Sequence, residues 1–385
     1  MNAKPDQRRW PVSHLACSLF LRIAGAACVA ILAAGCASHD LKNPGPSWPT
    51  SPSVIAHRGA SALRPEHTLA AYRKAIEDGA DSIEPDLVAT RDGVLVARHE
   101  NEISGTTNVA ELAQFSARKA SKTIDGAVVS GWFTEDFTLA ELKQLSARER
   151  IPANRPANTM YDDRHAVPTL QEIIDLVDSE SRARNKTIGL VPELKHPSYF
   201  KSIGLPLERR LVDALAANGY RGRDAAVFIQ SFETGNLKEL RAMAGYRLVQ
   251  LVSPSGAPHD AIEAGSGLTY ADMITPEGLR AIACYADVVA PYKTIVIPRD
   301  AAGELGAATR FVQDARGAGL AVHVWTMRPE NPFLPTGMRS APADSPSQRG
   351  DAAGEIRAYL EAGVDAVFTD DPAIGRTAID AVRKH

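Results

Sequence analysis

The amino-acid sequence predicts an α/β protein, a (β/α)₈ barrel with a small insertion after the region of its second strand. About eight short apolar or β-branched runs alternate with amphipathic helical segments from residue 54 to the C-terminus, which is the pattern of such a barrel. One long stretch, residues 102–165, interrupts this alternation. The alternative is an open doubly wound sheet, but no glycine-rich phosphate loop follows the first predicted strand.

Residues 1–35 have the features of an export signal. A basic start is followed by an apolar run over residues 23–34, which is too short to span a bilayer of about 30 Å as a helix. The run ends in Leu32-Ala33-Ala34-Gly35-Cys36, which resembles the lipobox of bacterial lipoproteins. We therefore expect an exported, periplasmic protein with a lipid on Cys36. Ala37 in the next position is similar to the outer-membrane sorting pattern. The alternative is an ordinary secretory signal with an unmodified cysteine.

Residues 36–52 are rich in Ser, Pro, Asn and Gly and predict a flexible tether. Residues 53–385 then form the predicted barrel domain, with an insertion at about 102–165. Once the signal is removed and Cys36 is acylated, Cys284 has no partner, so a disulfide framework is excluded. The formal net charge is −3, and the absence of a basic tract argues against nucleic-acid binding. The sequence leaves the oligomeric state open.

Each predicted element follows from local periodicity and flanking turn residues. Strands are expected at Val54–His57, Ser82–Val88 with Val94–His99, Thr187–Leu194, Ala225–Ser231, Arg247–Val252, Val288–Pro291, Ala321–Trp325 and Ala366–Thr369. Helices are expected at Glu66–Asp78, Thr169–Ser181, Leu205–Ala217, Glu233–Ala244, Pro276–Tyr285, Ala301–Ala318, Gly354–Ala362 and Pro372–Val382. Within the insertion, one helical segment is expected at Leu139–Leu145. The Pro-, Ser- and Gly-rich segment 328–350 predicts a loop.

Five chemically active side chains lie at or near the ends of the first strands. They are His57, Arg58, Glu84, Asp86 and His99. The two acids are separated by one residue, so on a strand they point the same way. Because the strand ends of a barrel converge on one mouth, these residues are expected to meet there. The combination indicates a metal and a phosphate handled by acid–base chemistry.

The third predicted strand adds Glu193 and Lys195, again separated by one residue. Together with Glu84 and Asp86, Glu193 would make an all-oxygen site of the kind that Ca²⁺ or Mg²⁺ prefers. Arg58 and Lys195 are suited to phosphate oxygens. Trp325 and Phe232 fit a substrate wall and core packing equally well.

These motifs resemble the glycerophosphodiester phosphodiesterase family, in particular its longer periplasmic bacterial members. The residues that carry the resemblance are His57-Arg58, Glu84-Pro85-Asp86, His99, Glu193-Leu194-Lys195, Val167-Pro168-Thr169-Leu170 and Thr369-Asp370-Asp371-Pro372. The resemblance runs from Val54 to the end of the chain, and no departure occurs at the expected catalytic positions.

The resemblance implies metal-dependent hydrolysis of glycerophosphodiesters to sn-glycerol 3-phosphate and an alcohol, usually with calcium. His57 and His99 are the expected general acid–base pair, since imidazoles titrate near neutral pH. The sequence does not assign which is the acid. The nucleophile is either the substrate's own 2-hydroxyl, through a cyclic phosphate, or a metal-bound water.

Two other functions remain as alternatives at this point. The same barrel and metal could act on a lysophospholipid or an inositol-type lipid, for which the aromatic residues at 132–137 leave room. The alternative from another class is a surface lipoprotein that binds a partner and has lost activity. The site residues that argue against lost activity are all intact, namely His57, His99, Glu84, Asp86 and Glu193. His165, His196, His259 and His323 belong to no such group of residues and are expected to be non-catalytic.

Overall fold

The computed structural model describes residues 40–383. The predicted signal and Cys36 lie outside the described residues. The strands are β1 (Ser53–His57), β2 (Ser82–Glu84), β3 (Asp86–Ala89), β4 (Leu95–Ala97), β5 (Ala120–Ile124), β6 (Ala127–Gly131), β7 (Gly189–Leu190), β8 (Glu193–Leu194), β9 (Phe228–Ser231), β10 (Arg247–Val252), β11 (Val288–Pro291), β12 (Ala321–Met327) and β13 (Ala366–Thr369). None of the helices within residues 40–383 has both the length and the apolar character that a membrane crossing requires.

The parallel strands close into the predicted (β/α)₈ barrel. β1 pairs with β13 on one side and with β2 on the other. The ring continues through β7 and β8 to β9, β10, β11, β12 and back to β13. The second and third strand positions are each occupied by two short pieces, β2 with β3 and β7 with β8. The fold class predicted from the sequence is therefore confirmed.

Proline explains why two predicted strands are split. Pro85 separates β2 from β3, and Pro192 precedes β8. A proline has no N–H to donate to the ladder, so regular pairing stops there. The carbonyls of both prolines still accept bonds from the neighbouring strand, from the N–H of Glu193 at 2.9 Å and the N–H of Gln230 at 2.9 Å. The barrel wall therefore stays continuous through the breaks.

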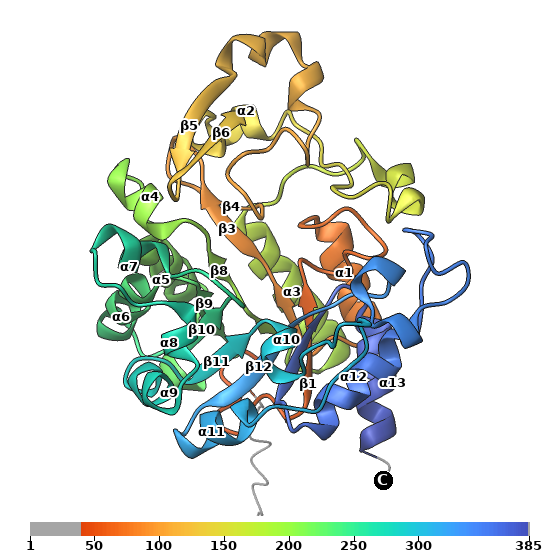
Figure 1. Ribbon diagram of the computed structural model, residues 1–385. Coiled ribbons are helices and arrows are strands. Elements are labelled where there is room, and N and C mark those ends of the chain that lie inside the picture. The colour runs from red at the N-terminus through yellow and green to blue at the C-terminus, as the bar shows by residue number, and fades with distance from the viewer. Residues whose placement is uncertain (1–39, 384–385) are drawn as a thin grey trace, which may run out of the picture. The chain divides into compact units, whose positions relative to one another are not determined.

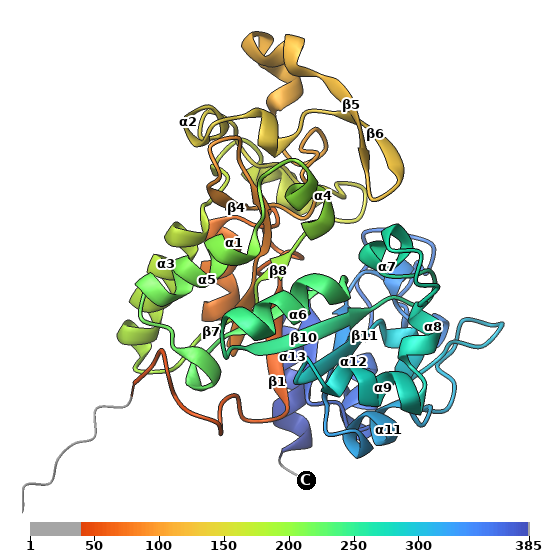
Figure 2. The same cartoon turned by 90° about the vertical axis from the view of Figure 1, so that its left-hand side faces the viewer.

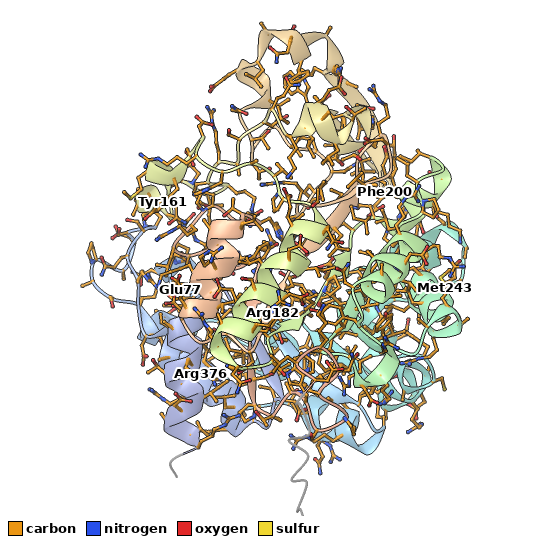
Figure 3. All side chains as sticks on the ribbon, turned by 180° about the vertical axis from the view of Figure 1, so that it is seen from behind. Glu77, Tyr161, Arg182, Phe200, Met243 and Arg376 are labelled. Atoms are coloured by element: carbon orange, nitrogen blue, oxygen red, sulfur yellow. The ribbon has the colours of Figure 1, made fainter. Side chains whose placement is uncertain are left out.

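The helices surround the barrel, as Figures 1 and 2 show. The longer ones are α1 (Leu69–Glu77), α3 (Leu170–Arg184), α5 (Glu208–Ala217), α6 (Thr234–Met243), α9 (Pro276–Ala283), α11 (Phe311–Gly317), α12 (Ala352–Glu361) and α13 (Pro372–Val382). Short ones are α2 (Leu139–Leu142), α4 (Pro197–Ser202), α7 (His259–Glu263), α8 (Tyr270–Met273) and α10 (Lys293–Val296). Seen from behind, Glu77, Arg182 and Arg376 mark α1, α3 and α13 (Figure 3).

Helix starts follow local capping chemistry. Thr169 and Glu172 form a capping box at the start of α3, and Asp371 caps α13, which satisfies backbone N–H groups that have no partner inside the helix. The helix predicted at Ala301–Ala318 begins only at Phe311. Gly303 and Gly306 lie in the part that is not helical, and glycine disfavours a helix by about 1 kcal/mol relative to alanine.

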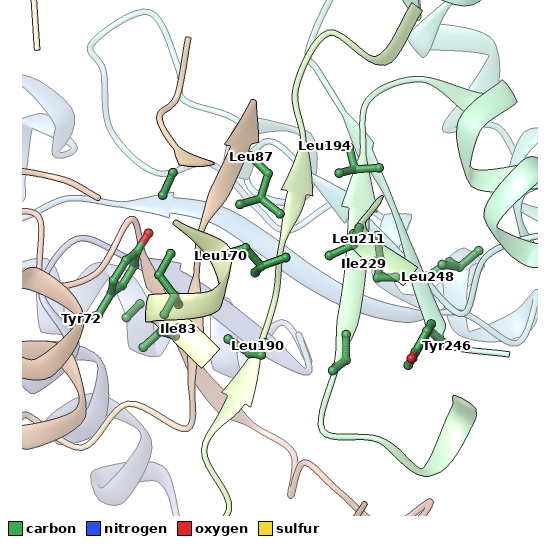
Figure 4. Packing of buried hydrophobic residues seen from close by; sticks show 14 of the residues in the cluster. Tyr72, Ile83, Leu87, Leu170, Leu190, Leu194, Leu211, Ile229, Tyr246 and Leu248 are labelled. Carbon is green, nitrogen blue, oxygen red and sulfur yellow. The ribbon is translucent and has the colours of Figure 1, made fainter. Parts of the chain in front are cut away.

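Two hydrophobic cores lie on the two faces of the barrel wall. The outer core packs the wall against the helices, with residues such as Ile83, Leu87, Leu190, Leu170 and Leu211 (Figure 4). The inner core fills the barrel with alternate residues of the same strands, including Ile55, Val191, Phe228, Val249, Leu251 and Phe368. Successive side chains of a strand point to opposite faces. The inward-facing positions are therefore apolar in the middle of the barrel, and at the carboxyl ends of the strands they carry the polar residues of the site.

Residues 40–52 differ from the flexible tether that the sequence predicts. They have no regular secondary structure but lie against the N-terminal ends of the strands. The Trp48 ring packs on Phe228, with centroids 5.7 Å apart, and Arg247 donates to the Gly45 carbonyl at 3.0 Å. A Cβ on Gly189 would come within 2.3 Å of the Trp48 ring. A bulky aromatic side chain therefore covers the bottom of the barrel.

The insertion between β4 and α3 carries its own small sheet. β5 and β6 pair only with each other, and their turn contains Asp125 and Gly126 with φ of 48° and 81°, as in a type I′ hairpin. Figure 1 shows this hairpin and α2 above the barrel, beyond β3 and β4. The helical segment that the sequence predicts at 139–145 is α2, at Leu139–Leu142. The sequence does not predict the hairpin. Residues 328–350 form a loop with two short 3₁₀ turns.

Candidate active site

The predicted site residues meet at one end of the barrel, where the strands have their carboxyl ends. A cavity of about 260 Å³ lies there. Eight of the predicted residues line it, namely His57, Arg58, Glu84, His99, Glu193, Lys195, Phe232 and Trp325. Asp86 lies next to it, within the carboxylate cluster described below. One end of the barrel thus collects side chains that are up to 268 residues apart in the sequence.

Three buried carboxylates form the centre of the site. Oxygens of Glu84, Asp86 and Glu193 lie within 4.8 Å of one another. Burial and the two neighbouring carboxylates raise the pKa of Glu84 well above its usual range, and burial raises the pKa of Glu193 to about 7. Burial also acts to raise the pKa of Asp86, but His67, Lys195 and Arg58 hold it well below its usual range.

The donor set of this cluster fits a hard divalent cation. All three ligand groups are carboxylates, which Ca²⁺ and Mg²⁺ prefer. Oδ1 of Asp86 is buried and accepts no hydrogen bond within the described residues, and a buried carboxylate oxygen without a partner is costly. Oδ2 of Asp86 accepts a hydrogen bond from Nε2 of His67 at 2.9 Å. The cluster therefore offers an unused oxygen and a concentration of negative charge where a cation could bind.

Two buried cations stand beside the carboxylates. The Arg58 backbone N–H donates to Oε2 of Glu84 at 2.7 Å, and its guanidinium donates to Glu66 at 3.1 Å. Lys195 donates from Nζ to Oε1 of Glu193 at 2.8 Å. Burial acts to lower the pKa of both cations, but the nearby carboxylates outweigh it and raise both values. Arg58 and Lys195 are therefore permanently charged.

The turn that positions Arg58 is tightly constrained. Arg58 and Gly59 both have positive φ, 59° and 89°, and a Cβ on Gly59 would come within 2.7 Å of the Ala71 backbone. Glycine is the residue that tolerates both the conformation and the close approach. The chain thus reverses directly after β1, which brings Arg58 back over the carboxylates.

His57 is oriented by Asp370 from the last strand. Nδ1 of His57 donates to Oδ1 of Asp370 at 2.6 Å, which leaves Nε2 free of a proton. Arg155 and Arg328 also contact the Asp370 carboxylate. Burial, and then Arg58, lower the pKa of His57 to about 4, although Asp370 opposes the shift. His57 is therefore a neutral imidazole whose Nε2 points toward the positively charged Arg58, at 3.3 Å from its Nε.

His99 is oriented from the other side, by the insertion. Its Nδ1 contacts Oε1 of Glu100 at 2.7 Å, and Oε2 of Glu100 accepts from Nε2 of His196 at 2.9 Å. Nδ1 of His196 donates in turn to Asp125, at the tip of the β5–β6 hairpin, at 2.6 Å. Burial lowers the pKa of His99, assisted by Arg58 and Lys195. The carboxylates of Asp125 and Glu100 outweigh burial at His196 and raise its pKa to about 9.

The structure adds residues that sequence reasoning missed. Asp370 belongs to the Thr369-Asp370-Asp371-Pro372 motif, but its contact with His57 spans 313 positions. His196, expected to belong to no group of residues, lies between Glu100 and Asp125. Trp325 and Phe232 pack edge to face, with centroids 5.5 Å apart, and both line the cavity. They therefore combine packing with contact to the cavity.

Comparisons with known proteins agree with this geometry. Residues 57–374 match the sequence profile of the Glycerophosphoryl diester phosphodiesterase family. A glycerophosphodiester phosphodiesterase of Arabidopsis thaliana is 30% identical over 370 residues, which covers 89% of this chain and 92% of that protein. A glycerophosphodiester phosphodiesterase of Haemophilus influenzae is 26% identical, over 77% of this chain and 84% of that protein.

Solved structures show the same fold. A glycerophosphoryl diester phosphodiesterase from Silicibacter pomeroyi has a TM-score of 0.60 at 21% identity, covering 89% of this chain and 96% of that one. A phosphodiesterase of Oleispira antarctica, solved in complex with the product sn-glycerol-3-phosphate, has a TM-score of 0.56 at 21% identity, covering 86% and 97%. On the profile match and the Arabidopsis relative, the chain belongs to the glycerophosphoryl diester phosphodiesterase family of enzymes.

Proposed function

We propose that this enzyme hydrolyses glycerophosphodiesters to sn-glycerol 3-phosphate and an alcohol, with a divalent cation held by Glu84, Asp86 and Glu193. The observation that carries the proposal is the carboxylate cluster with two cations and two histidines around one cavity. The product seen in the Oleispira antarctica relative supports the same substrate class. The all-oxygen ligand set suits both Ca²⁺ and Mg²⁺, and the family resemblance makes calcium the first choice and magnesium the second.

In this mechanism Arg58 and Lys195 bind the phosphate oxygens, and Trp325 with Phe232 forms the apolar wall beside the substrate. A cation bound at the three carboxylates supplies positive charge that offsets the negative charge developing at phosphorus. The positive charges of Arg58 and Lys195 also offset the negative charge that develops at phosphorus. Both lie close to the carboxylate cluster, so the phosphate is drawn to a defined place at the mouth of the barrel.

His57 and His99 are the proposed general acid–base pair. One, as a neutral imidazole, takes a proton from the attacking oxygen, which is the substrate's 2-hydroxyl or water. The other must enter the step protonated at Nε2, a state that the negative charge of the bound phosphodiester favours, and it donates that proton to the leaving alcohol. Each ring is held through Nδ1 by a carboxylate, Asp370 for His57 and Glu100 for His99. Both therefore present Nε2 for proton transfer, the arrangement in which a carboxylate fixes the tautomer of a catalytic imidazole.

The first test is metal dependence. Release of glycerol 3-phosphate from glycerophosphocholine is measured with EDTA, with Ca²⁺ and with Mg²⁺. We expect EDTA to abolish the activity and Ca²⁺ to restore it, and we expect Asp86→Asn to lower kcat/KM by about 10²–10³-fold, the loss typical of removing one transition-state electrostatic contact. Glu361→Gln, an exposed acid at the end of α12, is the control. Full activity in EDTA contradicts the proposed metal dependence. If no glycerol 3-phosphate is released with any metal, a lipid substrate or a binding role is favoured.

The second test uses the raised pKa of Glu193. In the metal-free protein its pKa rises from 4.5 to about 7, so the folded state holds this proton more tightly than the unfolded state. That contribution to stability is complete below about pH 4.5 and is lost as the pH rises through about 7. In EDTA, the free energy of unfolding of the wild type should therefore fall relative to that of Glu193→Gln by about 2–3 kcal/mol between these pH values.

Urea unfolding at a series of pH values measures this difference, and saturating Ca²⁺ should abolish the fall in the wild type. Glu361→Gln, which keeps Glu193, should follow the wild type. If the free energy of unfolding depends on pH in the same way in the wild type and in Glu193→Gln in EDTA, the raised pKa assigned to Glu193 is contradicted.

The third test concerns the histidines. We expect His57→Asn and His99→Asn each to lower kcat by at least about 100-fold, since a general acid or base contributes about 10²–10⁴-fold. Asp370→Asn removes the carboxylate that raises the pKa of His57, so the limb of the pH–rate profile that reports His57 should move to lower pH. His165→Asn is the matched control outside the site. A His99 variant within a few-fold of wild type rules out this assignment.

We also propose that the enzyme is exported to the periplasm and anchored by a lipid on Cys36, most consistent with the outer membrane. The support is the sequence of residues 1–37 alone. In a cell fractionation, Cys36→Ser should move the protein from the membrane fraction to the soluble periplasmic fraction, and Cys284→Ser should not. Equal membrane association of the wild type and Cys36→Ser defeats the proposed anchor.

A further inference from the structure

A second hollow adjoins the catalytic cavity. It has a volume of about 260 Å³ and shares Glu193, Lys195 and Phe232 with the first. Its other walls include Asp125 of the insertion hairpin, His196, Glu233, His259 and Tyr270. The shared residues include Lys195, which binds the phosphate in the proposed function, and Glu193, which holds the cation. A diester centred on them would extend into both spaces.

The charges of this hollow favour a cation. Lys195 and His196 are already paired, the first with Glu193 and the second with Glu100 and Asp125. Glu233 is 4% exposed, and its carboxylate accepts only from the backbone and hydroxyl of Ser198 among the described residues. Burial, with Asp260 and Asp125, raises the pKa of Glu233 to about 7. Lys201 is also a charged neighbour of Glu233, but its ammonium group pairs with Glu239. A buried carboxylate that forms no ion pair within residues 40–383 thus faces this space.

Aromatic rings complete the hollow. Tyr270 packs edge to face on Phe232, with centroids 6.3 Å apart, and Phe232 packs in the same way on Trp325 at 5.5 Å. Nζ of Lys195 lies 5.7 Å from the centroid of Phe232, so this ring already faces positive charge. A row of aromatic rings next to acidic groups attracts quaternary and primary ammonium ions, because the faces of the rings carry negative partial charge.

We infer that the hollow bounded by Asp125, Glu233, Phe232 and Tyr270 binds the leaving alcohol of the substrate and takes a cationic alcohol, of the choline or ethanolamine type. This inference rests on the proposed function. The glycerol part then lies on the Trp325 side of Lys195, and the alcohol on the Tyr270 side. A new P–O bond forms to the attacking oxygen, whose proton passes to one histidine. The P–O bond to the alcohol breaks, and the alkoxide takes a proton from the other histidine, which enters the step protonated.

The test compares kcat/KM of the full-length enzyme in Ca²⁺ for glycerophosphocholine, glycerophosphoethanolamine and glycerophosphoglycerol. We expect a preference of about tenfold or more for the two cationic diesters, which corresponds to about 1.4 kcal/mol. Glu233→Gln should reduce this preference at least fivefold. Tyr270→Leu, which removes the aromatic face without removing a charge, is the second variant and should reduce it for choline more than for ethanolamine. Glu361→Gln removes an exposed charge at the end of α12, outside the hollow, and should leave the preference unchanged.

An inhibition experiment separates the effect of the charge of the alcohol from the effect of its shape. Choline should inhibit hydrolysis of glycerophosphoglycerol, whereas 3,3-dimethylbutan-1-ol, its neutral isostere, should not do so at the same concentration. Equal kcat/KM for the three diesters, or an unaltered preference in both Glu233→Gln and Tyr270→Leu, overturns the inference while leaving the proposed function intact. If the wild type hydrolyses none of the diesters, the proposed function fails and this inference fails with it.

Discussion

The repulsion among three buried carboxylates is the constraint around which the site is built. Glu84, Asp86 and Glu193 come from two neighbouring strand positions, where β3 pairs with β8 and places Asp86 opposite Glu193. Like charges so close together in a buried place shift one another's pKa and cannot all ionise without compensation. The left-handed turn at Arg58, the buried Lys195 and the hydrogen bond from His67 each relieve part of this repulsion. A bound divalent cation would relieve the rest.

The two histidines depend on different parts of the chain. His57 is fixed by Asp370, so its orientation requires that the last strand closes the barrel next to the first. His99 is fixed by Glu100, which His196 connects to the insertion hairpin. The orientations of the two imidazoles therefore depend on both the barrel and the insertion. The rigidity of each ring comes from a carboxylate that is itself held by positively charged groups.

The sequence allowed the barrel and most of the site to be predicted because both depend on local periodicity. The alternation of strand and helix defined the ring, and acids separated by one residue on a strand indicated one shared face. Contacts over long sequence distances could not be found in this way. The pairing of Asp370 with His57 and that of Asp125 with His196 depend on how distant segments pack. The same holds for Trp48, whose Ser- and Pro-rich surroundings gave no sign that it covers the barrel.

The two strands of the insertion hairpin pair only with each other, as a two-stranded sheet outside the barrel ladder. Its tip nevertheless supplies Asp125 to the hollow next to the catalytic cavity. If the hollow takes the leaving alcohol as inferred, Asp125 meets the variable end of the substrate from outside the barrel wall that carries the carboxylates. For protein engineering, this makes the positions beside Asp125 at the hairpin tip a region where residues can be exchanged to change which alcohols are accepted. Asp125 itself is kept, because it holds His196 and, through Glu100, His99.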